Sequence, residues 1–145
     1  TRKSLSVSDK GRTFALPADG LCEITADIDA RSDGKAVFEL SNSHGEHTTV
    51  IYDAAANTLS VDRRESGISD FSHEFPCVTT APAFGNDGHL SLRLFLDRAS
   101  IEVFGNGGRA TLTNIIFPNE PYTTLTVKGS RARVSDLNVY TINAE

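Results

Sequence analysis

The stretch LRLFLDRASIEVFGNGG, residues 92–108, decides the fold, because two aliphatic runs meet there at a short polar segment. On both sides of residues 98–99, hydrophobic side chains alternate with polar or aromatic ones, and a period of two is typical of β-strands. If these two residues form the tip of a hairpin, Phe95 lies opposite Glu102. The stretch therefore predicts an antiparallel hairpin with two different faces.

The two faces of this hairpin predict different surroundings. One face is aliphatic and is expected in the core, where burial contributes about 1.5–3 kcal/mol per side chain; it carries Leu92, Leu94, Leu96, Ile101 and Val103. The other face combines charged and aromatic side chains: Arg93, Phe95, Asp97, Glu102 and Phe104. On this register Arg93 is diagonal to Glu102, within reach of an ion pair.

The carboxylates of Asp97 and Glu102 raise the question of catalysis. As diagonal neighbours they lie about 7–8 Å apart at the backbone, a spacing at which two carboxyl groups could flank a glycosidic bond. An acid catalyst needs a pocket that raises its pKa, however, and an open sheet face beside Arg93 has the opposite effect. We therefore favour a surface ion pair or an interface contact, with ligand binding as the remaining alternative.

The rest of the chain continues the period of two. Alternating segments separated by turn residues predict about nine or ten strands: LCEITADIDA, AVFELSN, TTVIYDAAANTLSVDRR, HLSLRLFLD, SIEVFGN, RATLTNIIF, TTLTVKG and ARVSDLNVYTI. Turns are expected at Asp33-Gly34, at 55–57 and at Gly129-Ser130. The predicted fold class is all-β, an antiparallel two-sheet β-sandwich of the jelly-roll or concanavalin-like kind, in a single domain over residues 1–145.

Composition excludes several classes of partner. The chain of 145 residues has 14 basic and 19 acidic side chains, and no basic cluster follows a phosphate backbone, so nucleic acid is not an expected partner. No apolar run approaches the length of a membrane span. Cys22 alternates with Ile24 and Ala26, which favours a buried free thiol, while a single bridge to Cys77 is the alternative. Neither a metal site nor a cofactor is predicted.

Two blocks of sequence resemble one known family. LRLFLDRASIEVFGNGGRATLTNIIFP is similar to the pattern LRIFVDRSSVEVFxNDG, followed by a strand and FP, in the C-terminal β-sandwich of glycoside hydrolase family 32. Upstream, LSVDRRESGISDFSHEFPCVTTAP resembles the DR(x)xSG, FS, F and AP pattern of the same module. The blocks appear in the family's order and together cover residues 59–118. The resemblance implies a relative of the invertases, inulinases and levanases.

The same resemblance implies that this chain is catalytically inert alone. Members of the family hydrolyse β-fructofuranosyl bonds in a β-propeller that precedes the sandwich, with motifs similar to WMNDPNG, RDP and EC. The chain contains no tryptophan and no Arg-Asp-Pro, and Glu23 follows Cys22 instead of preceding a cysteine. We therefore expect a domain excised from a longer chain whose N-terminal catalytic propeller is missing. The family context implies a secreted or periplasmic parent, although no targeting segment is present.

Two functions of different classes remain open at this point. In the first, which we favour, the sandwich packs against the catalytic propeller of the same chain and stabilises it, through an interface formed by Arg93, Phe95 and Phe104. In the second, it recognises β-fructan such as levan or inulin, through Asp62, Arg63, Asp97 and Glu102 with Tyr52 or Tyr122 as a stacking platform. An unrelated lectin-like or adhesion sandwich is the remote alternative.

Overall fold

Ten antiparallel β-strands make up the described part of the chain. The computed structural model describes residues 2–3, 12–16, 21–43, 45–62, 78–82, 88–97, 100–105, 110–115 and 122–141. The strands are β1 (Arg2–Lys3), β2 (Arg12–Ala15), β3 (Cys22–Ser41), β4 (His47–Asp53), β5 (Thr58–Asp62), β6 (Val78–Pro82), β7 (His89–Leu96), β8 (Ser100–Gly105), β9 (Ala110–Ile115) and β10 (Thr124–Thr141). The predicted all-β class is confirmed. Among the described residues, no helix has the length and apolarity to cross a membrane.

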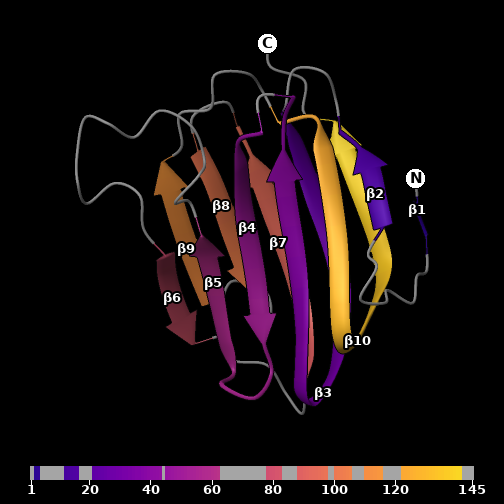
Figure 1. Ribbon diagram of the computed structural model, residues 1–145, viewed down its shortest axis with the longest axis vertical. Coiled ribbons are helices and arrows are strands. Elements are labelled where there is room, and N and C mark those ends of the chain that lie inside the picture. Colours follow the sequence, from indigo (N-terminus) through magenta and orange to yellow (C-terminus); the bar gives the residue numbers. More distant parts are fainter. Residues whose placement is uncertain are drawn as a thin grey trace.

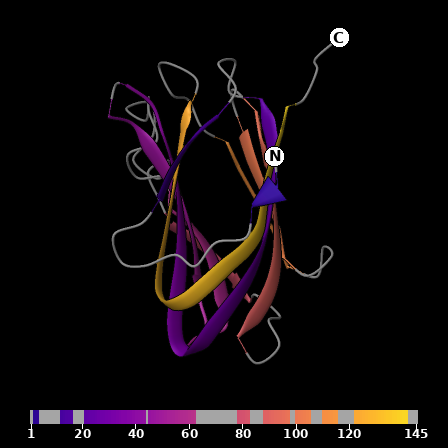
Figure 2. The same cartoon turned by 90° about the vertical axis from the view of Figure 1, so that its right-hand side faces the viewer.

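The strands form two layers that share their two longest strands (Figures 1 and 2). In what we call the β4 layer, the order is β6, β5, β4, the second half of β3, the first half of β10, and β2. In the β8 layer, the order is β9, β8, β7, the first half of β3, the second half of β10, and β1. Hydrogen bonding is therefore continuous from layer to layer, and the result is the predicted β-sandwich.

The two long strands bend where turns were predicted. Asp33-Gly34 and Gly129-Ser130 each lie inside a single continuous strand, between the half that pairs in one layer and the half that pairs in the other. Figure 2 shows both long strands folding back at the lower end of the sandwich, where β3 passes from β7 in one layer to β4 in the other and β10 runs beside it. The chain therefore changes direction at both predicted positions, although hydrogen bonding continues through them, because glycine permits so sharp a bend. The turn at 55–57 is confirmed, with Asn57 at a φ of 50°.

The bend depends on a close approach of two backbones. A Cβ atom on Gly34 would lie 2.4 Å from the carbonyl oxygen of Arg131, which is closer than any side chain allows. Arg131 itself takes a φ of 54°, and the register shifts between Ser130 and Ala132. Such a β-bulge increases the local twist and bends its strand. The corner of the sandwich is thus set by a glycine on β3 and a bulge on β10.

The space between the layers is filled by one hydrophobic cluster. It includes all five residues of the predicted aliphatic hairpin face, each at most 3% exposed. Cys22 is fully buried, as its alternation with isoleucine and alanine predicted, and Cys77 lies outside the described residues. Tyr52 and Tyr122 are also core residues, at 1% and 2% exposed, so the prediction that either provides a stacking platform for sugar is wrong. A tyrosine fits a core position when its hydroxyl group finds a partner.

Tyr122 has that partner, and the pair gives a prediction about pH. Its hydroxyl group lies 2.9 Å from the hydroxyl group of buried Thr48, and burial raises the pKa of Tyr122 to about 12. Below pH 10 the phenol is neutral in both folded and unfolded chains. Between pH 10 and 12 it ionises only in the unfolded chain, so the free energy of unfolding should fall by about 2–3 kcal/mol across this window.

Urea unfolding of the wild type and of Tyr122→Phe at a series of pH values measures this effect. The variant loses the hydrogen bond to Thr48 and should be less stable by about 1–2 kcal/mol at neutral pH. Because it has no phenol to ionise, its stability should fall less steeply above pH 10. Equal slopes in the two proteins would contradict the assignment of the high pKa to Tyr122.

Candidate functional site

The hairpin of β7 and β8 has the predicted register. Leu94 pairs with Val103 and Phe95 with Glu102, and the amide of Asp97 donates to the carbonyl oxygen of Ser100 at 2.9 Å. Both strands bury every second residue, as the alternation requires. The charged and aromatic side chains consequently lie together on the outer surface of the β8 layer. This surface is the candidate functional site.

Three of its side chains form a connected cluster. The rings of Phe95 and Phe104 meet edge to face, with 5.8 Å between centroids and an interplanar angle of 84°. The guanidinium carbon of Arg93 lies 5.3 Å from the centre of the Phe95 ring, within the range of a cation–π contact. The predicted interface residues are therefore in mutual contact, and both rings are half-buried.

The ion-pair partner of Arg93 is Glu23 on β3, and not Glu102 as the hairpin alone suggested. In the β3–β7 register, Glu23 is opposite Phe95, so it is the diagonal neighbour of Arg93 on the strand next to β7, on the same outer surface. The side chain of Glu23 is only 19% exposed, whereas Glu102 is exposed. Because a partly desolvated pair is stronger than a solvated one, Glu23 holds the arginine beside the phenylalanine ring.

Tyr140 adds an exposed ring beside the cluster, on the neighbouring strand β10. The sequence alone did not predict its role at this surface. It lies opposite Glu23 on β10 and is the exposed large hydrophobic residue of the described chain, at 48% exposed. A second register shift, between Ser135 and Asn138, reverses which residues of β10 face outward. Simple alternation through the tail does not reveal this shift. We call the surface formed by Glu23, Arg93, Phe95, Phe104 and Tyr140 the aromatic face.

The candidate sugar-binding residues are not brought together. Asp62 points outward from β5 in the β4 layer, while Glu102 points outward from β8 in the other layer, and the core lies between them. Asp97 is near the hairpin tip on the same side as Glu102, and Arg63 lies outside the described residues. A single sugar site made from all of these predicted residues is therefore not supported by the described geometry.

The carboxylates of the hairpin lack the surroundings that acid catalysis requires. Asp97 and Glu102 are both exposed, whereas a general acid for glycoside hydrolysis is held in a pocket that disfavours its charged form. Among the described residues, no three His, Cys, Asp or Glu side chains are grouped to hold a metal ion. The arrangement of the aromatic face instead presents rings and a fixed charge on a rigid sheet, as an interface does.

The fold and this surface define a two-layer all-β sandwich domain. Comparison with known proteins shows to which family of such domains the chain belongs. The sequence model of the family described as "Glycosyl hydrolases family 32 C terminal" matches residues 1–141. The chain therefore belongs to this family of C-terminal domains. This finding removes the alternative of an unrelated lectin-like or adhesion sandwich.

The curated relatives that this chain matches are much longer than the chain itself. A levanase of Bacillus sp. (strain L7) is 34% identical over 128 residues, which are 85% of this chain and 14% of that protein. A levanase of Bacillus subtilis (strain 168) is 36% identical over 121 residues, 81% of this chain and 18% of that protein. The structure of an exo-inulinase from Aspergillus awamori matches 99% of this chain with a TM-score of 0.79 and 25% identity, over 28% of its own length.

Proposed function

We propose that this chain is the non-catalytic C-terminal β-sandwich of a longer, secreted β-fructan hydrolase, and that its aromatic face packs against the catalytic domain. The matched relatives support this proposal by name: they include levanases, a fructan beta-fructosidase of Streptococcus mutans and extracellular exo-inulinases of Aspergillus species. The motifs that carry catalysis in the family do not occur in this sequence. The hydrolytic chemistry is therefore assigned to the rest of the parent protein.

The observation that carries the docking role is the organisation of the aromatic face. Tyrosine, phenylalanine and arginine are enriched at protein interfaces, and the most effective ones are fixed before binding, since their ordering then costs little entropy. Here Phe95 and Phe104 hold each other, and Arg93 is held by Glu23. Tyr140 adds an exposed ring in the adjacent row. The aromatic face therefore offers a partner domain a preformed apolar centre, in which the charged group of Arg93 is already paired.

Mutation of this face tests the proposal in the full-length parent enzyme. The double variant Phe95→Ser/Tyr140→Ser should lower the thermal midpoint of the enzyme by several degrees and shorten its activity half-life at elevated temperature about tenfold. This expectation follows from the loss of two interface anchors, each worth about 1–2 kcal/mol. The kcat/KM measured at low temperature should not change, because the proposal places the substrate in the catalytic domain and not on this face.

Ile51→Ser is the matched control. Ile51 is also half-buried and points outward, but from β4 in the other layer, where it lies opposite Val37 and Ser60. It should leave the half-life of the parent enzyme nearly unchanged. If Ile51→Ser destabilises the parent while the double variant does not, the docking surface lies on the β4 layer and the proposal is wrong.

Fructan recognition is the second candidate, and the exposed pair of Asp97 and Glu102 on one side of the hairpin is its remaining support. Calorimetric titration of the 145-residue chain with levan and inulin separates the two roles. Binding that is lost in Glu102→Ala, with the circular dichroism spectrum unchanged, would favour recognition. The docking proposal expects no binding at millimolar sugar.

A further inference from the structure

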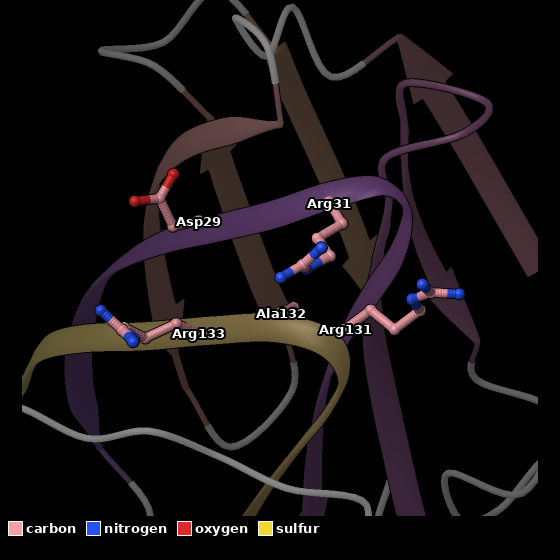
Figure 3. Close-up of a pocket in the computed structure, with 5 residues that line it drawn as sticks. All are labelled: Asp29, Arg31, Arg131, Ala132 and Arg133. Carbon is pink, nitrogen blue, oxygen red and sulfur yellow. The ribbon is translucent and has the colours of Figure 1, made fainter.

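The corner where β3 and β10 bend holds a cavity that the docking role does not use. It has a volume of about 330 Å³ and is lined by Asp29, Arg31, Arg131, Ala132 and Arg133 (Figure 3). Of the five described residues that line it, three are arginines, although the whole chain has a net charge of −5. The corner therefore concentrates positive charge on an otherwise acidic protein.

The bend itself brings the arginines together. On β3, residues 31–33 are all exposed, so the strict alternation stops and Arg31 points outward at the corner. On β10, the bulge at Arg131 gives that residue a φ of 54°, and Arg133 follows opposite Asp29 in the register. Figure 3 shows the guanidinium group of Arg31 between the two strands, with Arg133 and Asp29 on one side and Arg131 on the other; the exposed side chains of Arg133 and Arg131 extend away from it.

The acidic residues nearby leave part of this charge uncompensated. Arg131 is paired with Asp33 at 2.8 Å, and Asp29 lies 3.6 Å from the imidazole of His89. By contrast, among the described residues the side chains of Arg31 and Arg133 make no ion pair or hydrogen bond. Two guanidinium groups thus have their full set of donors available at one cavity.

Small side chains between the two strands leave these donors accessible. Ala132 is half-buried and lies opposite Ala30 on β3, so only methyl groups occupy the two facing positions. Among the described residues that line the cavity there is no aromatic side chain on which a neutral sugar could stack. Guanidinium groups bind carboxylate and phosphate oxygens through paired, charge-assisted hydrogen bonds. The available chemistry favours an anion of this kind.

We propose that the corner cavity binds an oxyanion, a carboxylate or phosphate group, between Arg31 and Arg133. Arg131 contributes positive potential at the rim while it remains paired with Asp33. Asp29 restricts the orientation of the ligand, because an oxyanion approaching its carboxylate is repelled. This chemistry could come from free inorganic phosphate or from a carboxylated glycan such as an oligogalacturonate. The site is independent of the docking face, which lies on a different part of the molecule.

Nuclear magnetic resonance titration of the ¹⁵N-labelled 145-residue chain tests the proposal, with inorganic phosphate and trigalacturonate as separate probes at constant ionic strength. The amide signals of residues 29–33 and 131–133 should shift with either probe. Arg31→Gln and Arg133→Gln should each weaken binding about tenfold, as expected for loss of a charge-assisted hydrogen bond. Added sodium chloride should weaken binding further.

Lys128→Gln is the matched control, since Lys128 is an exposed cation on β10 outside the cavity. Binding of phosphate alone would identify the ligand as free phosphate, and binding of trigalacturonate alone would identify a carboxylated glycan. Equal weakening by Lys128→Gln and Arg31→Gln would overturn the proposal, because it would show attraction without a site. Binding of neutral levan oligosaccharides with no response to either anion would also overturn it.

Discussion

Replacing Gly88 by alanine is expected to lower the free energy of unfolding by about 3 kcal/mol. Gly88 has a φ of +80°, and a Cβ atom on it would lie 2.0 Å from the carbonyl oxygen of Ala30. The carbonyl oxygen of Gly88 also accepts a hydrogen bond from the amide of Ala30 at 2.8 Å, so the two backbones cannot separate without losing it. Steric overlap and an unfavourable φ add together here.

Gly45→Ala provides the control that separates these two causes. Gly45 has a similar φ of +76°, but nothing lies within 4 Å of the position of its Cβ atom. This variant should lose only about 1 kcal/mol, the cost of a positive φ for a residue with a side chain. Chemical denaturation of both variants measures the difference. Equal losses would mean that the contact with Ala30 relaxes without cost, contrary to the expectation.

Truncation of Leu94 to alanine should have an effect of similar size, about 3 kcal/mol. Leu94 is fully buried in the centre of the β8 layer, with Ile24 opposite it on one side and Val103 on the other. Strands on both sides prevent the sheet from closing around the missing atoms, so a cavity remains. Since a domain of this size is stable by roughly 5–15 kcal/mol, the loss is a large part of the total.

Phe95→Ala, one residue further along β7, is the matched comparison. Its ring lies on the outer face and is only half-buried, in contact with Phe104 and Arg93. We expect a loss of about 1 kcal/mol in the 145-residue chain, although the substituted side chain is larger than leucine. Urea unfolding of the two variants side by side checks this order. A greater loss for Phe95→Ala would show that this face contributes to folding more than to docking.

Local sequence was sufficient for the hairpin of β7 and β8. A short tip and strict alternation fix which residues pair, so the register and the five core residues followed from residues 92–104 alone. Alternation was less informative for β3 and β10. A strand that bends at Gly34 keeps the same buried parity on both sides, so the pattern does not distinguish a bend from a turn.

The members of the candidate site that are distant in sequence could not be predicted. Glu23 and Arg93 are 70 residues apart, and their contact depends on the pairing of β3 with β7. Tyr122 was expected at the surface because tyrosine suits either environment, and its burial depends on Thr48, 74 residues away. Tyr140 was missed because a bulge in β10 changes the face to which it points.

The sequence by itself determined the all-β class, the two faces of the hairpin and the family, because a period of two and local motifs depend only on neighbouring residues. The tertiary structure decided which charges meet, which tyrosines are buried and that three arginines share one corner. These features depend on register between strands that are far apart in the chain. Register is set by packing of the whole sandwich, and a one-residue shift would move every outward side chain inward.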